Sequence, residues 1–497
     1  MDKKVINASK WSTATEVLSK LVAPITNMIL ARLLTPEIFG VVATLTMVTT
    51  FAEIFTDAGF QKYLVQHEFE TEQDYNLSTT VAFWTNLVLS LTIWGAIAIF
   101  AQPIASLVGS AGHEVAIVIL SAEIPLIAFS SIQQARFRRD FDFKKLFPVR
   151  MLVAAIPLFV TVPIAFIFRS YWALVIGILA KDIFNAVTLT LMSKWKPSFA
   201  YSFGKLKDML SFSIWTILEN ITIWLSTNIG VLILRFTLGE YYLGLYKTTI
   251  NTIVSYFNVI HISLASVMFS ALSRCQNDVD EFNSIFSKFQ RIIALIVFPL
   301  GVGIFVYNEL ATLILLGNQW TETAKFLGLR ALLQAFLIVF SYYNSEAFRS
   351  KGKPHLSMIA QALYLIASIP ILYYGASKNY ETLTVCSIIA GFILIFSTSA
   401  ISHYTIKIKF HRVLKNIAPQ FTASSIMGIF GYAMLMISKN IAWQIASVLM
   451  CMMVYFIALL ALFPKTRREL LSTPLAKKIM AKFKRKPLNE SRENNEF

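Results

Sequence analysis

The segments ILARLLTPEIFG (residues 29–40) and LILRFTLGEYYLG (residues 232–244) are two versions of one pattern, offset by 203 residues between Arg32 and Arg235. Charged residues are rare in apolar sequence, so charges that coincide at one offset indicate an internal repeat. The residues matched across the repeat are Thr13 with Thr216, Glu16 with Glu219, Arg32 with Arg235, Glu37 with Glu240 and, after a slip of one residue, Gly40 with Gly244.

The repeated segments lie within long apolar runs. Of the 497 residues, 56% are hydrophobic and 14% are charged, against about 25% charged in soluble domains. A helix that spans a bilayer needs about 20 mostly apolar residues, and the sequence contains fourteen such segments. The predicted spans are 10–33, 38–63, 77–101, 115–134, 147–168, 170–193, 208–236, 241–270, 286–307, 323–348, 355–376, 381–405, 416–437 and 441–463. The predicted fold class is therefore an all-α integral membrane protein with about 14 transmembrane helices.

The repeat also predicts the architecture. The offset covers six predicted spans, an even number, so both copies have the same orientation and form a parallel repeat. We expect two six-helix lobes plus two C-terminal helices, with a substrate site between the lobes. The predicted domains are an N-terminal lobe (1–200), a C-terminal lobe (201–410), two extra helices (411–464) and a basic cytoplasmic tail (465–497).

Basic residues alternate between the two sides of the predicted membrane. The loops 102–114 and 308–322 contain no Lys or Arg, whereas 136–145, 194–207 and 349–353 are rich in them. Basic residues favour cytoplasmic loops, so both termini are predicted to be cytoplasmic in a multi-pass membrane protein. The same pattern accounts for the net charge of +16 without nucleic acid as a partner.

Ionisable residues inside predicted spans indicate function, because each costs about 2.5–3.5 kcal/mol at the bilayer centre. Cationic side chains would bind a pyrophosphate headgroup through charge-assisted hydrogen bonds, although snorkelling to an interface is the alternative for Lys247 and Arg330. Glu16 and Lys20 share a helix face, either as a structural ion pair or as part of the cavity. The candidate substrate-binding residues are Lys20, Lys247, Arg330, Glu16 and Glu219.

Three carboxylates are candidates for coupling to an ion. Glu53 and Asp57 are four residues apart on one helix face, where their mutual repulsion favours binding of a proton or cation. The alternative is that both are hydrated near a helix end. Asp182 follows Lys181 in another predicted span and is the third candidate. The charged residues of the repeated turns are interpreted instead as structural, binding helix ends or each other: Arg32, Glu37, Arg235 and Glu240.

Motifs for chemistry are absent from the sequence. It contains no GxxxxGK[ST] phosphate loop, no catalytic signature such as GxSxG or HExxH, no CxxC pair and no metal-ligand spacing among its six histidines. We therefore expect a transporter rather than an enzyme, with no metal and no cofactor other than H⁺ or Na⁺ as a coupling ion.

Several segments resemble one family of membrane proteins. These are RLLTPEIFG (32–40), FAEIFTDAGFQKYLVQ (51–66), QQARFRRDFDFKKL (133–146), LGLYKTTINTI (243–253), VMFSALSR (267–274) and LGNQWTETAKFLGLRALLQAF (316–336). They resemble the O-antigen and colanic-acid exporters, Wzx-type polysaccharide flippases of the multidrug/oligosaccharidyl-lipid/polysaccharide (MOP) exporter superfamily. The resemblance covers residues 5–410.

The resemblance implies a V-shaped pair of bundles that works by alternating access. It implies a substrate of oligosaccharide on undecaprenyl diphosphate, flipped to the periplasmic face for surface polysaccharide such as O-antigen, capsule or exopolysaccharide. It also implies two kinds of partner: the lipid bilayer of the bacterial inner membrane, and the polysaccharide polymerase or ligase machinery. Two alternatives share the architecture: a lipid II-type cell-wall precursor flippase, and an ion-coupled multidrug antiporter. A membrane enzyme or an assembly scaffold is a third.

Overall fold

The computed structural model describes residues 18–19, 21–57, 60–140, 142–408, 410–464 and 467. Helices dominate this part of the chain and no strand occurs in it, which confirms the all-α class. The first described helix is Leu21–Leu33. A first bundle, the N-lobe, follows with α2 (Pro36–Asp57), α3 (Phe60–Gln66), α4 (Glu72–Ile99), α5 (Ala101–Leu107), α6 (Glu114–Ser121), α7 (Glu123–Arg139), α8 (Phe143–Phe159), α9 (Thr161–Phe168) and α10 (Trp172–Met192).

The long α11 (Phe203–Thr237) connects the N-lobe to a second bundle, the C-lobe, and contacts helices of both. The C-lobe contains α12 (Gly239–Arg274), α13 (Val279–Val306), α14 (Asn308–Leu315), η1 (Asn318–Thr323), α15 (Ala324–Phe336), η2 (Leu337–Tyr342), α16 (Tyr343–Ser350), α17 (His355–Lys378) and α18 (Tyr380–Thr405). Two further helices, α19 (Phe410–Ile437) and α20 (Ile441–Leu462), pack on the outside of the C-lobe against α13.

Eleven of the described helical segments are long and apolar enough to cross a membrane, so the chain is a multi-pass membrane protein. The helix α12, bent by 46° between Ile262 and Val267, is a twelfth. The predicted spans 10–33 and 208–236 include residues or side chains beyond those described, so the count of fourteen stays a prediction.

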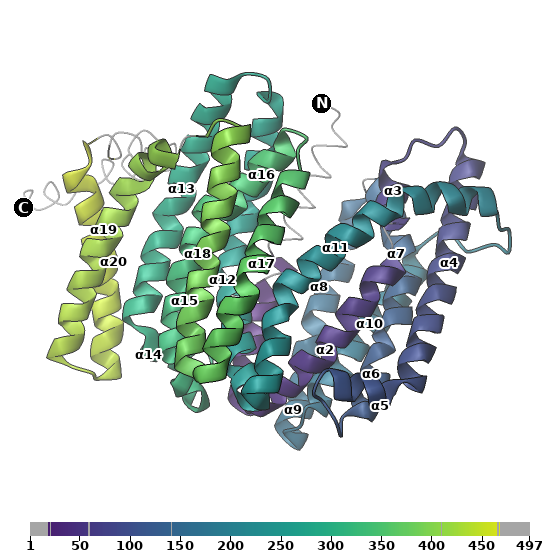
Figure 1. Ribbon diagram of the computed structural model, residues 1–497, viewed down its shortest axis with the longest axis horizontal. Coiled ribbons are helices and arrows are strands. Elements are labelled where there is room, and N and C mark those ends of the chain that lie inside the picture. Colours follow the sequence, from purple (N-terminus) through teal and green to yellow (C-terminus); the bar gives the residue numbers. More distant parts are fainter. Residues whose placement is uncertain are drawn as a thin grey trace, which may run out of the picture.

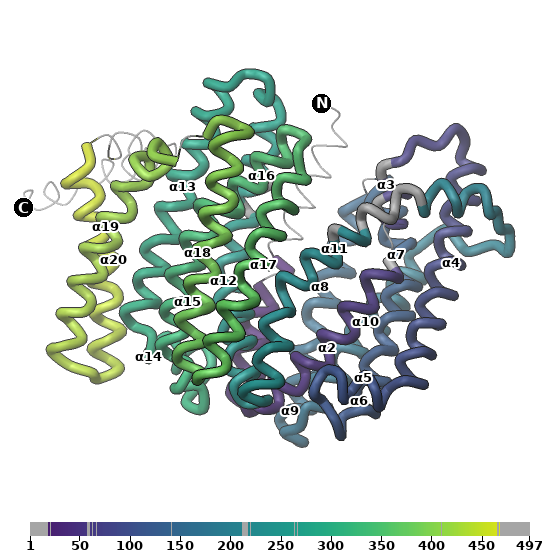
Figure 2. Tube along the Cα trace, viewed as in Figure 1, coloured from purple at the N-terminus to yellow at the C-terminus, as the bar shows by residue number. Residues whose placement is uncertain are grey.

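The two lobes form a V (Figure 1). They meet at one end of the molecule, near α9 and α14, and diverge toward the other end, near α3 and α16; we call these the joined end and the open end. The tube in Figure 2 shows α2 and α11 running from the joined end along the N-lobe side of the V. The V shape implied by the family resemblance is therefore confirmed.

Apolar side chains fill both lobes, and the largest core cluster joins C-lobe residues to N-lobe residues such as Met47. The outer surface of the molecule is also apolar. Trp320 and Tyr343 are fully buried in the C-lobe, and Phe60 and Phe83 are buried in the N-lobe. In contrast, large side chains such as Phe159 are 75% exposed. Water would penalise so much exposed apolar surface, whereas lipid does not, and helices satisfy their own backbone groups there.

The repeat is visible as a reciprocal contact between α2 and α12 at the joined end. A methyl group added to Gly40 would lie 2.0 Å from the carbonyl oxygen of Glu240, and one added to Gly244 would lie 1.8 Å from that of Pro36. Gly40 and Gly244 are matched in the repeat after the slip of one residue, and each glycine approaches the residue that lies four positions before the other. The two helices therefore cross as equivalent partners, which only glycine at both positions allows.

Arginine side chains from the repeated turns make a second reciprocal contact. Arg32 Nη2 donates 2.6 Å to the carbonyl of Ile314 at the end of α14, and its side chain packs on Gly317. Arg235 packs in the same way on Gly109, two residues after α5, and pairs with Glu240 at 2.6 Å. Each arginine thus reaches a turn of the opposite lobe, so its predicted structural role is confirmed.

Candidate functional site

A cavity of about 860 Å³ lies between the lobes. Its lining comes from the first described helix, from α2, α7, α8, α9 and α10 of the N-lobe, and from α12 of the C-lobe. Both apolar and polar side chains line it, and its size falls within the roughly 300–1,000 Å³ range of ligand sites. We call it the central cavity.

Among the described residues that line the central cavity, cations outnumber carboxylates. Arg150 of α8, Lys181 of α10 and Lys247 of α12 line it, together with Asp182. Lys181 Nζ lies 3.3 Å from Asp182 Oδ1. Asp182 is only 6% exposed, and its Oδ2 accepts no hydrogen bond from the described residues. Lys181 therefore neutralises Asp182, and Lys247 is a further cation of the described lining.

Lys247 is the cation contributed by the C-lobe. It is half-buried and makes no hydrogen bond or ion pair within the described part of the chain. Thr248 and Asn251, one turn of the same helix, line the cavity beside it. A cation in such a place is stabilised when an anion enters, because the anion supplies the hydrogen bonds that water would otherwise provide.

The structure distributes the predicted site residues over several places. Lys247 and Asp182 lie in the central cavity, whereas Glu53 lines a separate, smaller cavity of the N-lobe. Arg330 is in the C-lobe, where its Nη2 donates to Gln334 Oε1 at 3.0 Å, and it does not line the central cavity. The remaining candidates lie outside the described residues (Glu16 and Lys20) or have side chains outside them (Asp57 and Glu219).

Two of the cavity cations are not among the residues predicted to bind substrate. Lys181 is visible in the sequence as a charge inside a predicted span, next to the predicted ion-coupling residue Asp182. Arg150 lies at the start of the predicted span 147–168, among the basic residues that mark a cytoplasmic end. Its position one turn inside that span was the available signal.

Three arginines of α7, which in the sequence mark a cytoplasmic loop, also form hydrogen bonds to neighbouring helices of the N-lobe. Arg139 Nη1 donates to the carbonyls of Leu64 (2.8 Å) and His67 (2.6 Å), at the end of α3. Such carbonyls have no partner within their helix and carry partial negative charge. Arg136 donates to Asn76 Oδ1 at 2.7 Å, and Arg138 donates to Gln61 Oε1 of α3 at 2.7 Å. These side chains fasten α3 and α4 to α7 at the open end.

Comparison with known proteins places the chain among polysaccharide exporters. A family model described as "Polysaccharide biosynthesis protein" matches residues 29–325. The chain is 25% identical over 338 residues to the succinoglycan biosynthesis transport protein ExoT of Rhizobium meliloti (strain 1021), covering 67% of each chain. It is 20% identical over 413 residues to the lipopolysaccharide biosynthesis protein WzxC of Escherichia coli (strain K12), covering 82% of this chain and 81% of that one.

Among solved structures, the fold is similar to that of the lipid II flippase MurJ in an inward closed conformation. The TM-score is 0.76 at 14% identity, and the match covers 93% of this chain and 99% of the MurJ chain. At this level of identity the similarity concerns the fold. It confirms the V-shaped two-lobe architecture of the MOP superfamily over nearly the whole chain.

Proposed function

This chain belongs to the polysaccharide biosynthesis protein family of MOP exporters, and on that premise we propose that it is a flippase for lipid-linked oligosaccharides. Its substrate class is an oligosaccharide repeat unit on undecaprenyl diphosphate. The substrate moves from the cytoplasmic to the periplasmic face of a bacterial inner membrane, for the synthesis of surface polysaccharide.

The observation that carries the proposal is the excess of positive charge in the central cavity. Arg150, Lys181 and Lys247 line its described part, against the one described carboxylate, Asp182. A diphosphate bears negative charge on several acceptor oxygens, and bonds between such oxygens and cations are among the strongest that proteins form. The cavity lies between the lobes, where a rocking motion would expose it to one face of the membrane and then to the other.

The proposal also includes the orientation of the chain in the membrane and the ion gradient that drives transport. The distribution of Lys and Arg along the sequence supports cytoplasmic termini, which would make the open end cytoplasmic. Asp182 and Glu53 are the described carboxylates proposed to couple transport to H⁺ or Na⁺. A polymerase or ligase that receives the flipped repeat unit is a proposed partner. Translocation itself requires no bond to be made or broken, so we propose a transporter without enzymatic activity.

The alternatives fit the described site less well. A carrier of cationic drugs would need an acidic cavity, whereas the described lining of this cavity has more cations than carboxylates. A lipid II flippase would use the same cationic chemistry, but the family and the relatives above are named for polysaccharide synthesis.

Deletion of the gene in its native host tests the function. We expect undecaprenyl-linked repeat units to accumulate on the cytoplasmic face and surface polysaccharide to be lost, with both restored by the wild-type gene. Lys247→Ala should restore less than about a tenth of the polysaccharide, because a hydrogen bond to a charged group contributes about 1.5–3 kcal/mol. Lys247→Arg, which keeps the charge, should restore most of it.

Lys325→Ala is the matched control, since Lys325 forms an exposed ion pair with Glu381 far from the cavity. Each variant is first quantified in the membrane fraction. Normal polysaccharide with Lys247→Ala would remove the central cavity from the transport path. Unchanged lipid pools combined with altered dye resistance would support a drug carrier instead.

A further inference from the structure

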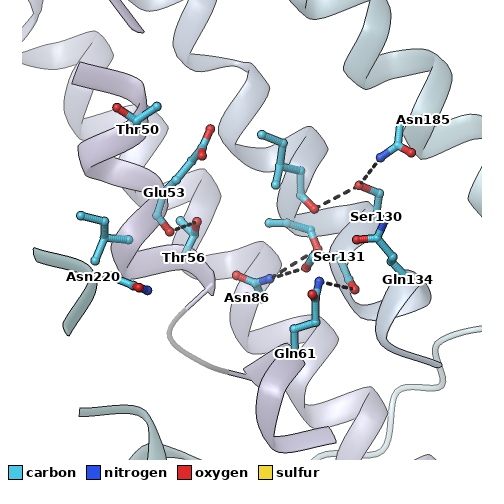
Figure 3. Close-up of a pocket in the computed structure, with 13 residues that line it drawn as sticks. Thr50, Glu53, Thr56, Gln61, Asn86, Ser130, Ser131, Gln134, Asn185 and Asn220 are labelled. Carbon is cyan, nitrogen blue, oxygen red and sulfur yellow. Dashed lines mark hydrogen bonds between the residues drawn. The ribbon is translucent and has the colours of Figure 1, made fainter. Parts of the chain in front are cut away.

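The N-lobe contains a second cavity, of about 300 Å³, with a lining unlike that of the central cavity. Its side chains come from α2, α3, α4, α7 and α10 of the N-lobe and from α11 (Figure 3). Most of them are amides and hydroxyls, and Glu53 is the one ionisable residue among the described residues that line it. The residues that carry the argument below are Glu53, Gln61, Asn86, Gln134, Asn185 and Asn220.

The chemistry of this lining suits a neutral ligand rich in hydroxyl groups. Amides and hydroxyls both donate and accept hydrogen bonds, as sugar hydroxyls do, and a carboxylate such as that of Glu53 accepts bonds from them. A phosphate would find no cation among the described lining residues. The second cavity thus complements the central cavity, in which cations predominate.

Asn86 offers an acceptor that the protein leaves unused. Its Nδ2 donates to Ala128 O (3.4 Å) and to Ser131 Oγ (3.1 Å), and a backbone carbonyl only accepts, so the orientation of the amide is fixed. Its Oδ1 is buried and accepts no hydrogen bond from any described residue. An unsatisfied buried acceptor costs about 1–3 kcal/mol, which a donor on a ligand would recover.

Other side chains of this cavity differ in how firmly they are held. Arg138 donates to Gln61 Oε1 at 2.7 Å, while Gln61 Nε2 donates to Ser131 O at 3.1 Å, so Gln61 is held on both sides. Gln134 and Asn220 make no hydrogen bond within the described part of the chain. The cavity therefore combines one side chain that is held in place, Gln61, with two amides that no described residue binds. The side chains of those two amides can rotate to match sugars with different hydroxyl positions.

The two cavities are neighbours. Gln134 and Asn185 line both of them, so the cavities share a wall and one ligand with two different groups could occupy both. In a lipid-linked oligosaccharide the first sugar is joined directly to the diphosphate. The order of the cavities, cationic and then neutral, matches the order of the groups in that substrate.

We propose that the second cavity binds the sugar residues next to the diphosphate, through hydrogen bonds from its amides, its hydroxyls and Glu53. This inference rests on the proposed flippase function and adds a site for the sugar. A transported ligand must also leave, so binding has to be specific without being tight. No aromatic ring lines the described part of the cavity, which leaves hydrogen bonds as the source of affinity.

Two lipids that differ only in the sugar test the proposal. The full-length protein in nanodiscs is titrated with undecaprenyl diphosphate and with the lipid-linked repeat unit extracted from the deletion strain. Asn86→Ala and Asn220→Ala, made separately, should each weaken binding of the sugar lipid by about 3- to 10-fold. Neither should change binding of undecaprenyl diphosphate, whereas Lys247→Ala should weaken binding of both lipids.

Asn416→Ala is the control, because its amide joins α19 to Ser287 of α13, away from both cavities. If the buried Asn86→Ala protein fails to fold, Asn220→Ala decides, since that side chain is only half-buried. Equal losses for both lipids, or unchanged affinity for both, would overturn the sugar site, as would a change confined to Na⁺ or pH dependence. If the wild type bound neither lipid, the proposed function itself would fall.

Discussion

At the scale of single residues, the Lys181–Asp182 pair determines how positive the central cavity is. Asp182 is nearly buried, whereas the Lys181 side chain is 37% exposed. A buried carboxylate without a cation costs more than the pair does, because its lost hydration is not repaid. The lysine thus holds Asp182 in place, whether or not it also contacts the substrate.

Removing one member of this pair should therefore harm the protein more than removing both. We expect Lys181→Ala to destabilise it by about 1–3 kcal/mol, less than for a fully buried pair because the lysine is partly solvated. The double variant Lys181→Ala/Asp182→Asn should recover most of that loss. Thermal midpoints of the detergent-solubilised protein measure both effects. If the double variant is no more stable than Lys181→Ala, the loss of stability does not come from leaving Asp182 without its cation.

At the scale of elements, the crossing of α2 and α12 depends on two glycines. Helices approach as closely as their side chains allow, and small residues bring backbones into contact in membranes. Here the contact is backbone to backbone, with carbonyl oxygens lying where a methyl group at Gly40 or Gly244 would have to be. The crossing therefore holds the two lobes together at the joined end.

Substitution of these glycines should separate the helices. Gly40→Ala would place a methyl group 2.0 Å from Glu240 O, and we expect a destabilisation of about 1–3 kcal/mol together with loss of transport. Gly95→Ala in α4 is the matched control, because nothing lies within 4 Å of the added methyl group. It should be neutral or stabilise the helix by up to about 1 kcal/mol. Equal thermal midpoints for the two variants would contradict a tight crossing.

At the scale of the whole molecule, the structure is joined at one end and open at the other. Arg32 and Arg235 hold the joined end by contacting turns of opposite lobes. Alternating access requires that this end open when the other closes, so contacts present in only one state set the balance between states. The two arginines are such contacts at the end that has to separate.

Loosening these contacts should favour the opposite state. Spin labels at Glu70 and Lys353, exposed residues at the open ends of the two lobes, report the separation of those ends. In Arg32→Ala/Arg235→Ala we expect a larger fraction of short distances. A change of about 1–3 kcal/mol would alter the ratio of states about 5- to 150-fold. The three cysteines of the chain are buried, which favours selective labelling.

Lys378→Ala, which removes an exposed cation at the end of α17, should leave the distance distribution unchanged. If the double arginine variant also kept the wild-type distribution, its contacts would not hold the joined end. In that case the contact between Gly40 and Gly244 would be what holds the joined end closed and sets the ratio between the two conformational states.

The sequence by itself determined the membrane spans and the repeat. In lipid every backbone group must be satisfied within its own helix, so a span depends on local apolar length, and the predicted 355–376 and 441–463 nearly coincide with α17 and α20. The matched residues around Arg32 and Arg235 likewise gave the two equivalent lobes, because a duplicated chain folds into a duplicated structure. Lys247 could be singled out because a charge in an apolar span is costly wherever the helix lies.

Only the tertiary structure decided which of these charges meet. Arg150 and Lys247, almost a hundred residues apart, line one cavity, whereas Arg330 faces Gln334 inside the C-lobe. The neutral cavity around Asn86 was not predicted at all, since amides and hydroxyls are common in membrane helices and carry no periodic signal. The rotation of each helix about its axis is set by packing against neighbours distant in sequence, and that rotation determines which side chains share a cavity.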